Sequence, residues 1–249
     1  MLKRLFDFLY APLAAFALTL ALLPVCLAVI VGPTAAIRRE TGRLGVRFML
    51  ACMGTRLRVR GLEYLPAEAC IVISNHVSYF DGLVMTAALP RRFTFVVKDD
   101  AAAWPLVGLT LKRMGVEFVQ RGNPRAAAKM TRMLIRRLGG GESFTIFAEG
   151  TFKPEPGLLP FKNGAFVIAT RAGVPVVPAA IRGTRQLYGG YNRLPRWSPI
   201  EVELRPPLQA EDSEQAAIRL RDAARAEVLK ICGEPDRQRA MAADSADAL

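Results

Sequence analysis

The longest apolar stretch of the chain lies near its N-terminus. No charged residue occurs between Asp7 and Arg38, and residues 8–37 are dominated by Leu, Ala, Val, Ile and Phe. A helix through this stretch is long enough to cross a bilayer, which needs about 20 apolar residues. The pattern predicts an N-terminal helical segment, residues 1–50, that anchors the chain to a membrane.

Three arrangements fit this N-terminal segment. Lys3 and Arg4 before an apolar run would fit a secretory signal peptide, although the run exceeds the usual length of about 7 to 15 residues. A single transmembrane span would hold the following domain on the cytoplasmic side, because basic residues follow the run. Pro12 and Pro24 favour a broken helix that returns to the same face, since both flanks are basic. The last two arrangements both predict a cytoplasmic-facing domain at the inner membrane.

After about residue 55, short β-branched runs alternate with helical stretches. The runs are almost continuously apolar, which is typical of strands covered on both faces. The alternation predicts an α/β fold with a central, mostly parallel sheet flanked by helices. The expected strands are 57–60, 70–74, 93–97, 116–119, 143–147, 174–181 and 200–204, and the expected helices are 81–89, 102–114, 123–138, 164–171 and 213–231. We expect one folded domain over residues 51–232 and a disordered tail over residues 233–249.

The charge balance of the chain indicates a broad class of partner. The chain has 34 Lys and Arg against 22 Asp and Glu, a net charge of +12, which attracts either nucleic acid or anionic lipid headgroups. The sequence contains no zinc-finger spacing, RNP-like aromatic strand or basic zipper, so we expect no specific nucleic-acid partner. The mean hydropathy of +0.21 favours membrane lipids as the partner.

Basic residues recur three or four positions apart in the predicted helix 123–138. They are Arg125, Lys129, Arg132, Arg136 and Arg137. The spacing predicts one solvated helix face. An ordinary exposed face and a headgroup-binding role fit this pattern equally well.

The single histidine lies at the end of an apolar strand, in the segment ISNHVSYFD (73–81). The carboxyl end of a strand, where it opens into a loop, is the usual place for the active site of an α/β sheet. Asp81 follows His76 by five residues, at the predicted start of a helix. Its carboxylate could accept a hydrogen bond from His76 Nδ1 and leave Nε2 free to take a proton. The two residues are therefore the candidate catalytic pair.

This HX4D pattern of His76 and Asp81 resembles the first signature block of the glycerolipid acyltransferase family, typified by bacterial 1-acylglycerol-3-phosphate acyltransferases of the PlsC type. Three further blocks follow in the family's order: GVEFVQR (115–121), FAEGT (147–151) and VPVVP (174–178). The segment FKNGAF (161–166) is similar to the family's lysine–glycine turn. The resemblance covers about residues 55–205, and four ordered blocks are far more specific than any single one.

The resemblance implies a glycerol-3-phosphate acyltransferase-like fold and the transfer of a fatty acyl group to the free hydroxyl of a lysolipid. The donor would be acyl-CoA or acyl carrier protein, and the acceptor most directly 1-acylglycerol-3-phosphate, in phospholipid biosynthesis. His76 would be the general base and Asp81 would orient it. Because the transfer is direct, no covalent acyl-enzyme is expected, and neither Ser78 nor Cys70 is assigned as a nucleophile.

The same resemblance implies a set of residues that bind substrate. Arg121 matches the arginine that binds the acceptor's phosphate, and Lys98, at a strand end, could add a second positive charge. The remaining members are Glu149, Gly150, Thr151, Lys162 and Pro178. No metal and no bound cofactor is expected, because one histidine and four dispersed cysteines offer no zinc site.

The third block departs from the family pattern. Relatives usually read Phe-Pro-Glu-Gly-Thr-Arg-Ser, whereas here Ala148 replaces the proline and Phe152-Lys153 replaces Arg-Ser. Lys153 or Lys162 could supply the missing charge, or the acceptor could be a lyso-amino-acid lipid or a lysophospholipid with a larger headgroup. A non-catalytic, membrane-associated lipid-binding protein is the alternative outside the enzymes.

Overall fold

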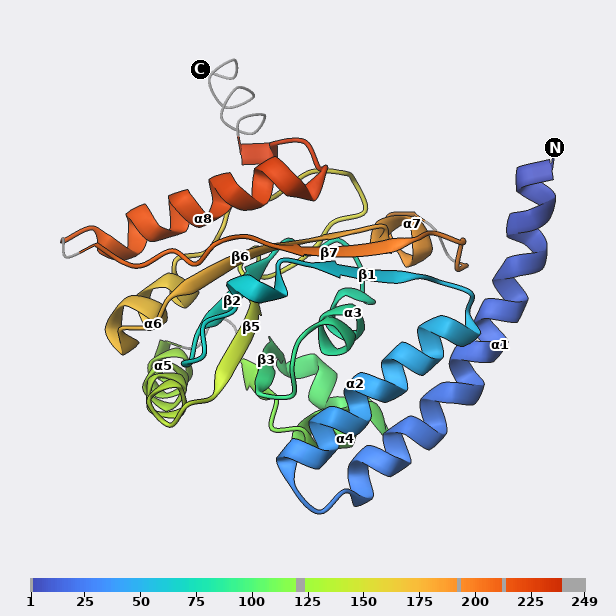
Figure 1. The fold of residues 1–249 in the computed structure, drawn as a ribbon, viewed down its shortest axis with the longest axis horizontal. Helices are drawn as coiled ribbons and strands as arrows, with labels where there is room; N and C mark the ends of the chain where they lie inside the picture. The colour runs from blue at the N-terminus through green and yellow to red at the C-terminus, as the bar shows by residue number, and fades with distance from the viewer. Residues whose placement is uncertain (1, 120–123, 192–193, 212–213, 239–249) are drawn as a thin grey trace.

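The computed structural model describes residues 2–119, 124–191, 194–211 and 214–238. Its centre is a β-sheet, in which the described residues form seven strands in the order β1-β7-β6-β2-β5-β3-β4 (Figure 1). The strands are β1 (Leu57–Arg60), β2 (Ile71–Ser74), β3 (Phe93–Lys98), β4 (Glu117–Val119), β5 (Ser143–Phe147), β6 (Val176–Arg182) and β7 (Ile200–Leu204). Each strand end lies within two residues of its predicted position, because continuous apolar runs mark buried strands locally.

The strands confirm the predicted mostly parallel sheet. Strands β6, β2, β5, β3 and β4 run parallel to one another, whereas β7 is antiparallel to β6 and parallel to β1. Ser74, the last residue of β2, lies opposite Phe147 of β5 and Ala179 of β6. The loop that follows β2 therefore starts at the middle of the edge where the parallel strands end.

Helices cover both faces of the sheet (Figure 1). One face carries α1 (Leu2–Val31), α2 (Ala35–Cys52), α3 (Asp81–Ala88) and α4 (Val107–Arg113), and the other carries α5 (Pro124–Gly139), α6 (Gly164–Ala172) and α8 (Ala216–Cys232). The short helix α7 (Thr184–Tyr188) follows β6. Each face has its own apolar core: Val72 of β2 belongs to the first, and Ile71 and Ile73 belong to the second, as strand alternation requires.

The predicted helix 102–114 is divided in two. A 3₁₀ turn over Asp99–Ala103 is followed by α4, which begins only at Val107. Pro105 disfavours a helical conformation at the residue before it, and Leu106 has a positive φ of 59°. The prediction of one continuous helix here was wrong because proline chemistry overrides the apolar pattern.

The N-terminal residues form a helical hairpin made of α1 and α2. Helix α1 continues through Pro12 and Pro24, so the predicted break at the prolines was wrong. The chain reverses instead around Gly32, and Thr34 caps α2 by accepting a hydrogen bond from the Ile37 backbone N–H at 3.2 Å. Inward-facing α1 residues such as Ala14 are buried in the first core. Helix α1 is therefore part of the folded domain.

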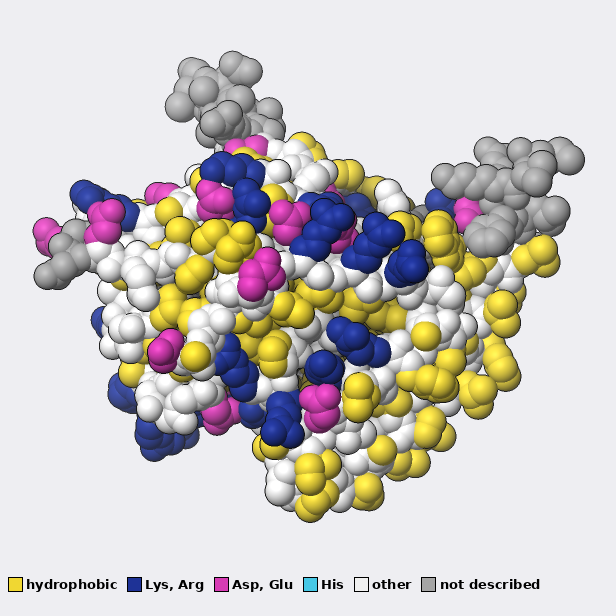
Figure 2. Space-filling view, viewed as in Figure 1, with side chains coloured by type: hydrophobic (Ala, Val, Ile, Leu, Met, Phe, Trp, Pro, Cys, Tyr) yellow, Lys and Arg dark blue, Asp and Glu magenta, His cyan; other side chains and the backbone are white. Residues whose placement is uncertain are grey.

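The outer face of this hairpin is apolar. Leu9–Val31 is long and apolar enough to cross a membrane. The large apolar side chains exposed along the hairpin are Leu9, Leu13, Phe16, Leu20, Leu23, Leu27 and Val31 of α1, and Ile37, Leu44 and Phe48 of α2. Figure 2 shows apolar side chains gathered over α1, at the right of the view. An apolar face of this length on one side of a protein marks a membrane contact.

We expect Gly45→Ala to destabilise the hairpin. A Cβ atom at position 45 would lie 2.5 Å from Cγ1 of Val25, so α1 and α2 would have to separate. Overpacking of this kind costs about 1–3 kcal/mol, which a lower thermal midpoint in detergent would report. Gly139→Ala in α5 is the control, because its added Cβ meets no atom within 4 Å. A Gly45→Ala protein with the stability of the Gly139→Ala protein would contradict this packing.

Candidate active site

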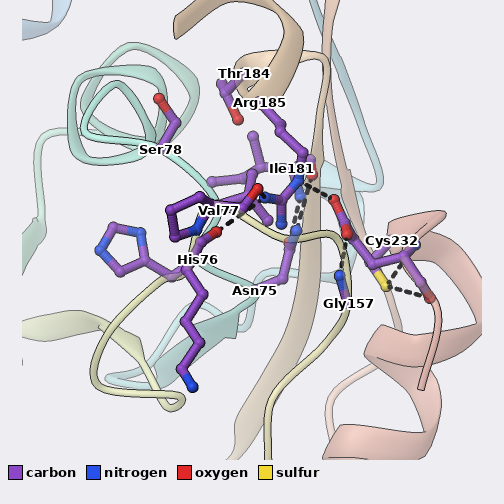
Figure 3. Close-up of polar contacts among 12 residues, drawn as sticks. Asn75, His76, Val77, Ser78, Gly157, Ile181, Thr184, Arg185 and Cys232 are labelled. Carbon is purple, nitrogen blue, oxygen red and sulfur yellow. Dashed lines mark hydrogen bonds and ion pairs between the residues drawn. The ribbon is translucent and has the colours of Figure 1, made fainter. Parts of the chain in front are cut away.

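The loop after β2 is fastened to the neighbouring strand β6 by a buried amide. Asn75 is fully buried, its Oδ1 accepts a hydrogen bond from the Ile181 backbone N–H at 2.8 Å, and its Nδ2 donates to the Ile181 carbonyl at 3.0 Å. Figure 3 shows this pair beside the His76 ring, which projects away from it. Both polar atoms of the Asn75 side chain form hydrogen bonds to backbone groups. The position of Asn75, the residue before His76, is therefore fixed.

His76 and Asp81 are in direct contact. His76 Nδ1 lies 2.9 Å from Asp81 Oδ2, and the Asp81 side chain is fully buried whereas 20% of the His76 side chain is exposed. A carboxylate oxygen accepts, so Nδ1 donates and the Nε2 lone pair is left to bind a proton. The backbone N–H groups of Val77 and Ser78 also donate to Asp81 Oδ2, at 2.7 and 2.8 Å. The spacing-based prediction that the two side chains meet agrees with this geometry, and their catalytic role stays a prediction.

Thr184 completes the environment of Asp81. Its Oγ1 donates a hydrogen bond to Asp81 Oδ1 at 2.6 Å, and its side chain is fully buried. The turn that places Thr184 beside Asp81 requires glycine at position 183. The φ angle of Gly183 is 90°, and a Cβ atom there would lie 2.0 Å from the Pro199 carbonyl oxygen. Thr184 is absent from the predicted site residues, since the fourth block ends at Pro178. The Gly183-Thr184 pair shortly after the predicted strand 174–181 was the available signal.

Glu149 points inward rather than toward the solvent. Only 3% of the residue is exposed; Oε1 accepts from the His76 backbone N–H at 2.6 Å and Oε2 accepts from the Leu159 N–H at 2.7 Å. Burial raises the pKa of Glu149 to about 7, although these two N–H donors act against the shift. The carboxylate therefore joins His76 to the loop 152–160, and each of its oxygens accepts a hydrogen bond from a backbone N–H group.

The turn after Glu149 brings together Gly150, Thr151 and Lys162, three of the predicted binding residues. Gly150 has a φ of 71° and its backbone N–H donates to the Phe147 carbonyl at 2.9 Å. A Cβ at Gly150 would lie 3.0 Å from Lys162 Nζ, so the lysine ammonium lies against this glycine. Thr151 and Lys162 are both exposed. They offer a hydroxyl and a positive charge at the surface next to the residue that holds His76.

Aromatic rings surround the His76 imidazole. Phe147 stacks on it with centroids 4.4 Å apart, and Phe152 meets it edge-on at 4.7 Å. Tyr79 contacts Phe152 at 4.8 Å, and Trp104 lies 6.4 Å from Tyr79. Phe152 is the residue that replaces the arginine of the usual third block. An aromatic ring therefore stands against the imidazole at a position where the family pattern has a charged residue, and this apolar contact suits an acyl chain better than water.

The remaining predicted binding residues lie apart from this cluster. Lys98 forms an ion pair with Asp100, and Pro178 is buried within β6, opposite Ile73. Neither has a hydrogen bond or ring contact to His76 among the described interactions. Arg121 lies outside the described residues. The proposed roles of these three residues in binding stay predictions.

Two side chains near His76 are unsuited to act as nucleophiles. The Ser78 hydroxyl donates to the Tyr188 carbonyl and accepts from the Phe80 backbone N–H at 3.1 Å, and it points away from His76 in Figure 3. Cys70 precedes β2, and burial raises the pKa of its thiol to about 11. Within the described ranges no group of three or more His, Cys, Asp and Glu residues could hold a metal ion.

The loop 152–160 is held by residues near the C-terminus. Arg185 Nε lies 2.7 Å from Glu234 Oε1, and the Gly157 N–H donates to Glu234 Oε2 at 2.5 Å (Figure 3). Glu234 lies in the predicted tail, of which residues 239–249 are outside the described part of the chain. Its two contacts join α7 to the loop that also holds Glu149.

Fold and site together define a class: an α/β protein in which a partly exposed histidine contacts a buried aspartate at the carboxyl edge of a mostly parallel sheet. The family model described as Acyltransferase matches residues 56–182, a little over half of the chain. The human 1-acyl-sn-glycerol-3-phosphate acyltransferase alpha is 31% identical over 193 residues, which cover 74% of this chain and 68% of the human protein. The chain belongs to the Acyltransferase family.

Further relatives extend this comparison. The chloroplastic 1-acyl-sn-glycerol-3-phosphate acyltransferase BAT2 of Brassica napus is 34% identical over 131 residues, which cover 52% of this chain but only 38% of that protein. The lyso-ornithine lipid O-acyltransferase of Rhodobacter capsulatus is 28% identical over 190 residues, which cover 67% of this chain and 66% of that protein. The fold matches the crystal structure of the 1-acyl-sn-glycerophosphate acyltransferase PlsC from Thermotoga maritima with a TM-score of 0.73, at 21% identity, over 92% of this chain and 97% of that one.

The raised pKa of Glu149 predicts a pH-dependent stability. Between pH 4.5 and about 7 the folded chain holds a proton that the unfolded chain has released, so the free energy of unfolding falls as pH rises through this window. The contribution is on the order of 3 kcal/mol. Denaturant titrations at about pH 4 and about pH 8 should show a smaller fall for Glu149→Gln than for the wild type. Glu68→Gln, at an exposed site, is the control; an unchanged fall in Glu149→Gln would show that the group does not titrate there.

Proposed function

We propose that this protein transfers a fatty acyl group from a thioester donor, acyl-CoA or acyl carrier protein, to the free hydroxyl of a lysolipid. The single observation that carries the proposal is the His76–Asp81 contact, in which Nδ1 is engaged and Nε2 has no hydrogen-bond partner among the described residues. The family membership supports the same reaction type. A water-using lipid hydrolase has less support, because the sequence contains no Gly-x-Ser-x-Gly elbow.

In this mechanism His76 Nε2 removes the proton of the acceptor hydroxyl as its oxygen attacks the thioester carbonyl. The new ester C–O bond forms and the C–S bond breaks, and the imidazolium then protonates the leaving thiolate. Asp81 stabilises the imidazolium through Nδ1. The buried Ser78 and Cys70 take no part, so no acyl-enzyme forms.

The first candidate acceptor is 1-acylglycerol-3-phosphate, which appears in the names of the human and Brassica napus relatives. Lys162, exposed beside Gly150, is a suitable partner for a phosphate in the absence of the usual third-block arginine. The Rhodobacter capsulatus relative, named for lyso-ornithine lipid, supports an amino-acid lipid as the second candidate. The apolar face of the α1–α2 hairpin would hold the protein at the membrane, where either acceptor resides. We place the catalytic domain on the cytoplasmic side, because basic residues follow the apolar run.

His76→Ala should lower turnover by roughly 10²–10⁴-fold, because general base catalysis supplies about that factor. The assay uses purified protein, a labelled acyl thioester and a panel of lysolipids, and separates acylated lipid from free fatty acid. Tyr79→Phe is the matched control: Tyr79 is in the same loop and 65% exposed, and its ring contact with Phe152 survives the change. Full turnover by a folded His76→Ala protein would contradict the role of His76 as the base. A wild-type protein without turnover, whose lipid binding the His76→Ala variant keeps, would favour the non-catalytic binding protein. Free fatty acid as the main product would favour the hydrolase.

Thr184→Val should lower kcat by roughly 10-fold with little change in KM, because it removes one hydrogen bond that holds Asp81 Oδ1 and leaves the side-chain volume nearly unchanged. Thr184→Ser restores the hydroxyl and should recover most of the rate. Equal losses in the two variants would indicate a packing role alone.

A further inference from the structure

Helix α5 carries a row of exposed positive charge, the α5 basic stripe, which the proposed mechanism does not use. It consists of Arg125, Lys129, Arg132 and Arg136, at intervals of four, three and four residues. These intervals place the four side chains on one face of a helix. All four are exposed, and none has an ion pair or hydrogen bond among the described interactions. Arg137, by contrast, turns inward and pairs with Glu117 and Glu142.

The α5 basic stripe lies on the sheet face opposite the apolar hairpin. Leu134 and Leu138 of α5 pack into the second core with α6 and α8, whereas Ala14 of α1 and Met49 of α2 pack into the first. Figure 2 shows the separation, with Lys and Arg side chains at the lower left, over α5, and apolar side chains at the right, over α1. A protein held at a bilayer by α1 turns α5 away from that surface. The stripe therefore faces the aqueous phase and fits a soluble anionic partner better than lipid headgroups.

One end of the stripe lies at the same edge of the sheet as the candidate active site. Strands β2 and β4 both run parallel within the sheet, so their carboxyl ends share one edge. His76 follows β2 at that edge, and α5 starts shortly after β4, at Pro124. A partner that binds along α5 thus has its Arg125 end close to the sheet edge where His76 would act on the thioester.

The length of the stripe distinguishes between the two classes of donor. Arg136 lies eleven positions after Arg125 in the helix, which corresponds to a rise of about 16 Å. A row of this length matches an acidic helix of a protein, whereas the phosphates of one CoA molecule form a compact group at one end of the donor. Four unpaired cations in a row also suit steering of a highly acidic protein toward the site.

From these observations we infer that the α5 basic stripe docks the acidic surface of an acyl carrier protein, which delivers the acyl thioester to His76 from the side away from the membrane. This inference rests on the proposed acyl transfer and selects its donor. The lipid acceptor then approaches from the hairpin side and the donor from the α5 side.

The test compares Lys129→Glu/Arg132→Glu with the control Arg58→Glu/Arg91→Glu, which makes the same change in net charge at exposed residues outside α5. With full-length protein and acyl carrier protein as donor, the stripe variant should raise KM by roughly 10-fold or more and the control by less than about 2-fold. KM for acyl-CoA should not change in either variant. Rising salt should raise the wild-type KM for the carrier protein and affect the stripe variant less.

Binding of the carrier protein to the same variants in a His76→Ala background provides a readout that does not require turnover. Equal effects of the two double variants, equal effects on both donors, or wild-type activity with acyl-CoA alone would overturn the docking inference. Loss of binding to anionic vesicles by the stripe variant, with an unchanged KM for the carrier protein, would assign the stripe to the membrane. Carrier protein binding without acylation of any lysolipid would instead contradict the proposed function.

Discussion

The arrangement of the site depends on one buried carboxylate. Asp81 is fully excluded from solvent and accepts four hydrogen bonds, from His76 Nδ1, the N–H groups of Val77 and Ser78, and Thr184 Oγ1. A buried charge without such partners would cost several kcal/mol, so the segments that supply them must converge. The loop after β2, the start of α3 and the turn after β6 are thereby held together, and the imidazole is oriented as a consequence.

A second buried carboxylate supports the same loop from the other side. Glu149 holds the His76 backbone and the Leu159 N–H, while Glu234 and Arg185 hold the loop 152–160 against α7. These contacts join side chains from the turn after β5, from α7 and from the segment after α8 to backbone N–H groups of His76 and of the loop. An imidazole that is fixed in this way would need little rearrangement on acting as the proposed base, which is the main advantage of preorganisation.

The helices on the two faces of the sheet expose different kinds of side chain. The α1–α2 hairpin presents large apolar side chains on one side, and α5 presents unpaired positive charge on the other. His76 lies at the sheet edge between them, among the rings of Phe147 and Phe152. This division suits the acyl transfer proposed above, in which the lipid acceptor comes from the membrane and the thioester donor from the aqueous phase.

The sequence by itself determined the strands, the placement of His76 at a strand end and its pairing with Asp81, since apolar runs and a five-residue spacing are local properties. Tertiary structure decided the rest. Thr184 reaches Asp81 across 103 residues of chain, and the Glu149 carboxylate turns inward to bind backbone 73 residues away. The hairpin reverses at Gly32 and Pro33 rather than at Pro12 or Pro24, because packing against the core stabilises α1 through both of the latter prolines. Contacts between distant segments form only when the sheet brings strand ends together, and no local pattern encodes them.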